Sequence, residues 1–201
     1  MEIKVAIQGI QGSFHHQVAH RYFGEAIGLD ECVTFRDVAN SLKNKKSDKA
    51  IMAIENSIAG AILPNYALID SYDLHIIGEH FLDIHMNLMV FPGQTIEEIQ
   101  EVHSHPIALL QCANFFSQYP HIKLVESSDT AIAAKRIQEN QLKGIGALGG
   151  PVAAEIYNLE IIANGIHTVK SNKTRFVVLK ASNKEIPKEL INKASIKFEL
   201  D

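Results

Sequence analysis

The chain of 201 residues is 46% hydrophobic and 21% charged, which is typical of a globular protein with one large domain or two small ones. Its net charge of −4 argues against nucleic-acid binding, and it has no apolar run of about 18 residues that could span a membrane. The first residues alternate too regularly for a signal peptide, and Cys32 and Cys112 lack motif spacing, so we expect a cytoplasmic protein with reduced thiols and no membrane partner.

The N-terminal segment predicts a strand, a glycine turn and a capped helix. Residues 4–8 are β-prone, Gly9 and Gly12 turn the chain, and Ser13 can cap a helix over residues 14–23. Free backbone N–H groups at such a corner can bind an anion. A plain turn between strand and helix explains the same residues equally well.

The next buried segment ends in polar residues. Residues 50–54 form a nearly continuous apolar run, as in a strand buried on both faces. Asn56 and Ser57 follow its carboxyl end, where open α/β sheets bind their ligands. Both residues are therefore candidates for ligand binding.

The segments between and after these predict further alternating strands and helices. Expected strands cover residues 33–35, 74–81, 84–91, 122–125 and 144–148. Expected helices cover residues 38–42, 64–72, 96–102, 107–118, 130–139 and 151–157, the fifth of them capped by Asp129. This alternation predicts an α/β fold with a largely parallel sheet.

The segment after residue 170 leads from a turn into a strand. Ser171-Asn172-Lys173 is turn-prone and residues 174–179 are β-prone, so Thr174 and Arg175 should lie at the mouth of the strand. A hydroxyl and a guanidinium there can donate hydrogen bonds to a small anion. If Thr174 faces a ligand, Phe176 shares its side and Arg175 points away. Arg175 then either contacts the ligand or supports the site from behind, and both alternatives stay open.

Several short motifs resemble, in this order, those of the prephenate dehydratase family. They are GIQGSF (9–14), AIENSIAG (53–60), LHIIGE (74–79), IH (84–85), SHP with QC (104–106 and 111–112) and TRF (174–176). Ile10 stands where the family usually has proline, and His15 where it often has serine. We expect His15 to be exposed on the first helix rather than to act as a catalytic acid.

The resemblance implies a fold and a reaction. The implied fold is α/β, with two βα subdomains and a cleft between them, as in type II periplasmic binding proteins; residues 1–80 with 168–182 form one subdomain and residues 81–167 the other. The implied reaction converts prephenate to phenylpyruvate in L-phenylalanine biosynthesis, a carbon–oxygen lyase step that needs no cofactor. Thr174 is the implied catalytic residue. The implied substrate-binding residues are Gly12, Ser13, Asn56, Ser57, Ser104, Gln111, Arg175 and Phe176.

Other functions remain open at this point. The motifs do not separate prephenate dehydratase from an arogenate or cyclohexadienyl dehydratase, and the same fold serves non-catalytic small-anion binding proteins. A metal site is not expected, because His16 and His20 would share a helix face without an evident third ligand.

The C-terminal residues predict the start of a further domain. Residues 183–201 contain a charged linker and then an alternating segment, similar to the first strand of the ACT domain that follows in the family. The sequence is then either a truncated catalytic region or a natural short form, and we expect no feedback inhibition by phenylalanine unless a further segment exists. The resemblance also implies a homodimer.

Overall fold

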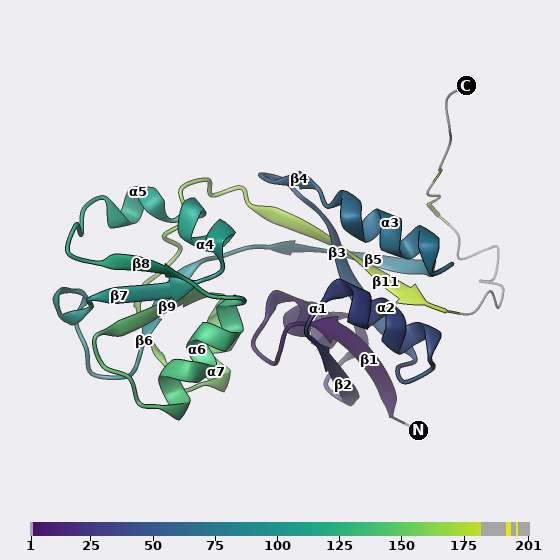
Figure 1. Ribbon diagram of the computed structural model, residues 1–201, viewed down its shortest axis with the longest axis horizontal. Coiled ribbons are helices and arrows are strands. Elements are labelled where there is room, and N and C mark those ends of the chain that lie inside the picture. Colours follow the sequence, from purple (N-terminus) through teal and green to yellow (C-terminus); the bar gives the residue numbers. More distant parts are fainter. Residues whose placement is uncertain (1, 182–191, 194–195, 197–201) are drawn as a thin grey trace.

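The computed structural model describes residues 2–181, 192–193 and 196. Two lobes lie side by side, each built on its own sheet (Figure 1). The chain forms most of the first lobe, crosses to the second, and returns with β11 to the first.

The first lobe combines a mixed sheet with three helices. Its elements are β1 (Ile3–Gln8), α1 (Phe14–Phe23), β2 (Ile27–Cys32), α2 (Phe35–Lys43), β3 (Lys49–Asn56), β4 (Gly60–Ala61), α3 (Leu63–Ser71), β5 (His75–Asp83) and β11 (Lys173–Lys180). The strand order is β2-β1-β3-β11-β5, with β4 paired to β3. β1 is parallel to β2 and β3, whereas β11 is antiparallel to β3 and β5.

Alternate residues of the central strands enter two different cores. Ile7 and Phe176 pack with Val18 of α1, on what we call the α1 face of the sheet. Val177 packs with Leu42 of α2 and residues of α3, on the α2–α3 face. Burial on both sides explains why β3 and β11 read as apolar runs.

The second lobe has the same layered plan. Its elements are β6 (Asn87–Val90), η1 (Ile96–Glu98), β7 (Glu101–Ser104), α4 (Pro106–Gln111), α5 (Ala113–Phe116), β8 (Lys123–Glu126), α6 (Thr130–Glu139), β9 (Ile145–Gly149), α7 (Pro151–Ile156) and β10 (Glu160–Ala163). The strand order is β10-β6-β9-β7-β8. β7 is parallel to β8 and β9, whereas β6 is antiparallel to β9 and β10.

Two segments connect the lobes and are bonded to each other. Ile84 N–H donates to the carbonyl of Asn172 at 2.8 Å, and Ile166 N–H donates to the carbonyl of Met86 at 2.8 Å. Met86 N–H also donates to Nδ1 of His167 at 3.3 Å. The crossing from β5 to β6 therefore lies beside the crossing from β10 to β11.

The predicted α/β class with two βα units is confirmed, but the expectation of a largely parallel sheet was wrong, because each sheet contains both parallel and antiparallel pairs. Some element predictions were wrong as well. No strand covers residues 33–35, because Thr34 caps α2 by accepting from Asp37 N–H. The strand lies earlier, at β2. The helix expected over residues 107–118 is broken at Cys112 into α4 and α5, and only η1 is helical in the segment 96–102. The subdomain boundaries stay a prediction. In the structure β5 extends to Asp83, so the strand pairing of the first sheet continues beyond residue 80.

The C-terminal linker and the apparent ACT strand lie mostly outside the described residues. Lys193, which is described, forms an ion pair with Glu79 of β5. Among the described residues, no helix has the length and apolar character that crossing a membrane requires.

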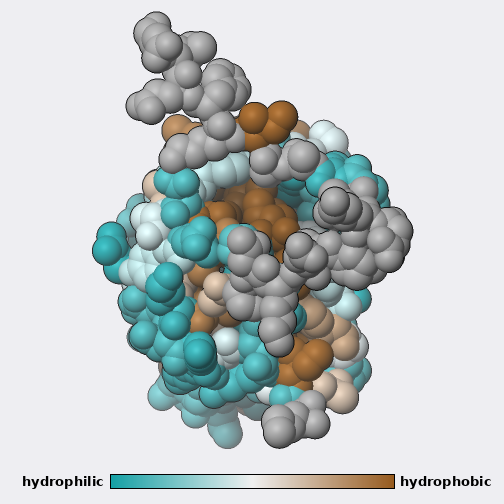
Figure 2. Space-filling model, turned by 90° about the vertical axis from the view of Figure 1, so that its right-hand side faces the viewer, coloured by the Kyte–Doolittle hydropathy of each residue, from teal (hydrophilic) through white to brown (hydrophobic). Residues whose placement is uncertain are grey.

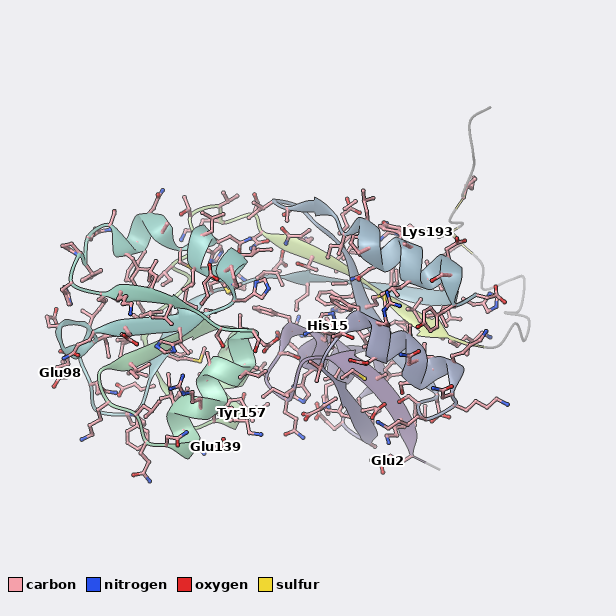
Figure 3. All side chains as sticks on the ribbon, viewed as in Figure 1. Glu2, His15, Glu98, Glu139, Tyr157 and Lys193 are labelled. Carbon is pink, nitrogen blue, oxygen red and sulfur yellow. The ribbon has the colours of Figure 1, made fainter. Side chains whose placement is uncertain are left out.

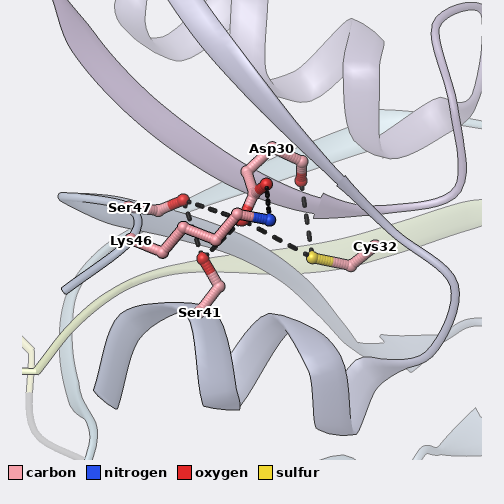
Figure 4. A network of polar contacts seen from close by, with 5 residues as sticks. All are labelled: Asp30, Cys32, Ser41, Lys46 and Ser47. Atoms are coloured by element: carbon pink, nitrogen blue, oxygen red, sulfur yellow. Dashed lines mark hydrogen bonds and ion pairs between the residues drawn. The ribbon is translucent and has the colours of Figure 1, made fainter. Parts of the chain in front are cut away.

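A buried polar network fastens the loop after α2 to β2 (Figure 4). The Asp30 carboxylate, only 5% exposed, accepts hydrogen bonds from Ser41 Oγ at 2.6 Å and Ser47 Oγ at 3.2 Å. Lys46 Nζ lies 2.6 Å from Asp30 Oδ1. Burial by itself would raise the pKa of Asp30. The hydrogen bond and charge of Lys46, together with the hydrogen bonds of Ser41 and Ser47, hold this pKa below its ordinary value.

Replacing Asp30 by asparagine should lower the free energy of unfolding at pH 7 by about 1–3 kcal/mol, because the amide keeps only one acceptor oxygen and no charge, so either Lys46 or the serine hydroxyls lose their partner. A carboxylate with a lowered pKa stabilises the fold above its unfolded-state pKa, and this contribution is lost as the pH falls through the folded-state value. The difference between variant and wild type in urea unfolding should therefore shrink below about pH 4. Glu139→Gln on the exposed end of α6 is the control, and an unchanged Asp30→Asn protein would contradict this role.

Candidate functional site

Asn56 and Thr174 meet where β3 ends and β11 begins. Asn56 Nδ2 donates to Thr174 Oγ1 at 2.9 Å. The amide orientation is fixed, because Asn56 Oδ1 accepts the backbone N–H groups of Ile58 and Ala59, both at 3.0 Å. The threonine oxygen therefore accepts from Asn56, which leaves the hydroxyl hydrogen of Thr174 free to be donated elsewhere.

A chain of amides extends this pair into the second lobe. Asn56 Nδ2 also donates to Asn172 Oδ1 at 2.7 Å, and Asn172 Nδ2 donates to Gln111 Oε1 at 3.1 Å. Gln111 is the last residue of α4, so the chain joins both lobes. Asn172 is only 1% exposed, and sequence reasoning did not select it as a site residue. Its position two residues before Thr174, in a polar turn, was the available signal.

Ser57 fastens the loop that carries Asn56. Its Oγ donates to the carbonyl of Ser171 at 3.0 Å and accepts from Lys173 N–H at 2.9 Å. Ser57 N–H donates to the carbonyl of Lys173 at 2.8 Å. Its hydroxyl is thus engaged by backbone, and contact with a substrate stays a prediction.

The Gly9–Ser13 loop faces the second lobe. Gly12 has a φ of +88°, and a Cβ on it would lie 3.0 Å from the Tyr157 ring and 3.2 Å from Ala153 Cα of α7, so both conformation and space require glycine. Tyr157 Oη donates to the carbonyl of Gln11 at 2.6 Å. Ser13 is 3% exposed and caps α1, because its Oγ accepts the N–H of His16 at 3.2 Å. The N-terminus of α1 therefore lies at the lobe boundary, where it favours negative charge.

Arg175 does not join Thr174. Its Nε and Nη2 lie 2.9 and 2.8 Å from Glu79 Oε2, and its Nη1 lies 3.7 Å from Glu55. Hydrogen bonds from Lys193 and Arg175 hold the pKa of Glu79 below its usual value against the effect of burial. Pairing with two carboxylates is what we expect if Arg175 supports the site from behind. Direct contact of Arg175 with the substrate stays a prediction.

Ser104 and Phe176 present almost no surface. Ser104 is 0% exposed and its Oγ donates to the carbonyl of Leu148 at 3.0 Å, while Phe176 is 2% exposed in the core. Contact of either side chain with a ligand would require their surroundings to move.

The expectation that His15 is exposed was wrong. The side chain is only 8% exposed, and its ring lies 5.0 Å from the Phe176 ring and 5.4 Å from the Phe35 ring. Figure 3 places it near the centre of the molecule. Burial lowers the pKa of His15 to about 3, so the imidazole is neutral at pH 7 and cannot act as an imidazolium acid.

Asp129 supplies a carboxylate to the lobe boundary. Its Oδ1 accepts from Ala131 N–H at 2.7 Å, as the cap of α6. Its Oδ2 would lie 3.1 Å from a Cβ on Gly9, so it faces the first lobe. Burial raises the pKa of Asp129 despite the hydrogen bonds of the cap. Sequence reasoning recognised only the cap.

The structure also contains two hollows away from Thr174. One of about 470 Å³ is lined by Gln11, His20, Ile27, Leu29 and Glu31. The other, about 340 Å³, is lined by His85, Asn87, Pro151, Asn164 and Gly165. Neither touches the amide chain, so the hydrogen bonds rather than cavity size locate the candidate site. Within the described part of the chain, no cluster of three or more His, Cys, Asp or Glu residues could hold a metal.

The fold and site define a two-lobed α/β protein whose polar residues gather at strand ends near the lobe boundary. The chain belongs to the prephenate dehydratase family, since the family model described as prephenate dehydratase matches residues 5–184.

Relatives support this membership. A bifunctional chorismate mutase/prephenate dehydratase of Buchnera aphidicola is 32% identical over 194 residues, covering 94% of this chain and 50% of the relative. Arogenate dehydratase 2 of Petunia hybrida is 36% identical over 200 residues, covering 99% and 50%. The chain thus spans about half the length of these relatives.

Solved structures share the fold. A prephenate dehydratase of Arthrobacter aurescens in complex with L-Phe superposes with a TM-score of 0.80 at 24% identity, covering 89% of this chain and 60% of that one. GqqA, described as a novel type of quorum quenching acylase, has a TM-score of 0.79 at 29% identity, covering 92% and 66%.

Proposed function

We propose that this chain catalyses the decarboxylating dehydration of prephenate to phenylpyruvate, a step of L-phenylalanine biosynthesis. One carboxylate leaves as carbon dioxide, its bonding electrons enter the ring, and the ring hydroxyl leaves with a proton as water. The observation that carries the proposal is the Asn56–Thr174 hydrogen bond, which leaves the threonine hydrogen free for the departing oxygen.

The proposed catalytic role of Thr174 is hydrogen-bond donation to the leaving hydroxyl. A threonine hydroxyl is a very weak acid, so it stabilises developing negative charge or relays a proton rather than ionising itself. Asn56 holds its oxygen in place, and the amide chain through Asn172 to Gln111 ties that position to the second lobe. Release of carbon dioxide and gain of aromaticity provide the driving force from within the substrate.

The substrate carries two carboxylates, and we propose that the N-terminus of α1 receives one of them. Backbone N–H groups and the helix dipole favour an anion there without a net positive charge. Gly12 and Ser13 are the proposed contacts, and Gly12 lies against α7 of the second lobe. Their N–H groups donate to His16 Nδ1 at 3.3 Å and to the carbonyl of Ile10 at 3.0 Å, so a bound carboxylate would have to take over these bonds. Binding between the lobes would orient the elimination and exclude water.

The direct test mixes the purified chain with prephenate and follows phenylpyruvate by its absorbance in alkali. We expect turnover without added metal or cofactor. Ligand binding without turnover would overturn the proposal in favour of a small-anion binding protein.

Arogenate is the second candidate substrate. It differs from prephenate by an ammonium in place of the side-chain keto group, and the Asp129 carboxylate at the lobe boundary suits an ammonium partner. Identity of 36% to a Petunia arogenate dehydratase supports the same alternative.

If arogenate is turned over, Asp129→Asn should lower kcat/KM for arogenate about 10–100-fold more than for prephenate, because a charge-assisted contact is lost only with the ammonium. Asparagine keeps the cap of α6, which separates this effect from unfolding. Equal losses for both substrates would remove Asp129 from substrate selection.

We also propose a homodimer in the cytoplasm. The family resemblance supports the dimer, and Figure 2 shows hydrophobic side chains among hydrophilic ones on the end of the first lobe, a mixture that interfaces also use. Cys32 and Cys112 are free and buried, which suits a reducing compartment. Sedimentation velocity should show a dimer, and a monomer at micromolar concentration would contradict it.

A further inference from the structure

Strand β3 changes its alternation just before the candidate site. Ala53 packs on the α1 face and Ile54 on the α2–α3 face. Continued alternation would place Asn56 on the same side as Ile54. Asn56 instead bonds Thr174, which shares the α1 face with Phe176.

One extra residue in β3 accounts for this change. Phe176 pairs with Ala53 and Arg175 with Glu55, so Ile54 has no partner on β11. The pairing of β11 with β5 runs without a shift from Lys173 to Val178, so the irregularity belongs to β3. Because a bulge reverses which side the following residues take, it turns Asn56 towards Thr174.

Groups from outside the sheet bond the backbone of this bulge. His15 Nε2 accepts Ala53 N–H at 3.3 Å, and Asn65 Nδ2 donates to the carbonyl of Ala53 at 2.7 Å. Ile62 N–H donates to the carbonyl of Ile54 at 2.8 Å. The bulge is therefore held from α1 on one side and from the start of α3 on the other.

Burial makes the two side-chain bonds decisive. Asn65 is 1% exposed and His15 is 8% exposed. If either side chain were removed, water could not easily take its place, and the Ala53 backbone group that it bonds would be left without a partner. His15 must be neutral to accept at Nε2, and its lowered pKa of about 3 is consistent with that. Any other register of β3 would leave these buried groups unpaired.

We propose that His15 and Asn65 are positioning residues that hold the β3 bulge and thereby direct Asn56 onto Thr174. The effect on turnover rests on the proposed function, whereas the effect on the bulge does not. Neither side chain is proposed to touch the reacting atoms.

The test compares two substitutions at His15. His15→Phe keeps a ring against Phe35 and Phe176 but removes the acceptor, while His15→Gln offers an oxygen at similar reach. We expect His15→Phe to lower kcat for prephenate about 10–100-fold with KM changed less than about threefold, since a small misplacement of a catalytic group has effects of this size. His15→Gln should recover most of the loss, and His20→Phe on the same helix should resemble wild type.

Amide hydrogen exchange provides a second readout that does not depend on turnover. The N–H groups of Ile58 and Ala59 are bonded to Asn56 Oδ1, so they should exchange faster in His15→Phe and in Asn65→Leu than in wild type and His15→Gln. An inactive wild type would end the proposed function, yet the exchange result would still decide the positioning role. The positioning role would be overturned by unchanged exchange rates in both His15→Phe and Asn65→Leu. Equal losses of kcat in His15→Phe and His15→Gln would also overturn it.

Discussion

Thr174→Val should lower kcat for prephenate by about 100–1,000-fold, the usual cost of losing one donor aimed at developing charge. Valine keeps the size and branching of threonine but cannot donate to the leaving hydroxyl. Thr174 is 8% exposed near the start of the well-packed strand β11, so the fold should survive the change. Initial rates of phenylpyruvate formation at saturating prephenate measure the effect.

Thr174→Ser is the matched control for this prediction. Serine retains the hydroxyl and the hydrogen bond from Asn56, so its rate should stay within about tenfold of wild type. Circular dichroism and thermal unfolding should show intact folds for both variants. Wild-type rates in Thr174→Val would remove Thr174 from the chemistry.

Asn56→Asp should be nearly as damaging, with kcat/KM for prephenate lowered about 100-fold or more. The aspartate oxygen that replaces Nδ2 cannot donate to Thr174, so the threonine hydroxyl turns to the carboxylate instead of the substrate. The added negative charge also repels a dianionic substrate.

Glu55→Gln, one residue earlier on β3, is the control for position, because it exchanges a carboxylate for an amide beside Asn56 without altering the Asn56–Thr174 bond. Glu55 is exposed and lies 3.7 Å from Arg175, so its loss should change the rate little. Steady-state kinetics at pH 7 compare kcat/KM for prephenate between the two variants. Comparable rates for Asn56→Asp and Glu55→Gln would argue that Asn56 does not orient Thr174.

The sequence predicted the class of fold, and it selected two residues of the candidate site that lie far apart in the chain. Asn56 and Thr174 were selected because both adjoin strand ends and both fall in ordered motifs, and the structure brings them within hydrogen-bonding distance. Local patterns could not show how they meet. The bulge at Ile54 depends on pairing between β3 and β11, which are separated by most of the chain.

Other misses have similarly physical reasons. The strand β2 escaped prediction because Asp30 interrupts its apolar pattern, and the groups that bond this carboxylate come from α2 and the loop after it. His15 was expected to be exposed on the first helix. The helix instead buries His15 with Val18, and Tyr22 is 40% exposed.

A structure of this chain with an unreactive prephenate analogue that keeps the ring hydroxyl would test the proposed role of Thr174. We expect Thr174 Oγ1 within about 3 Å of that hydroxyl, with Asn56 still donating to Thr174 and one carboxylate at the N-terminus of α1. A ring hydroxyl bonded to another residue, with Thr174 out of reach, would contradict the central claim.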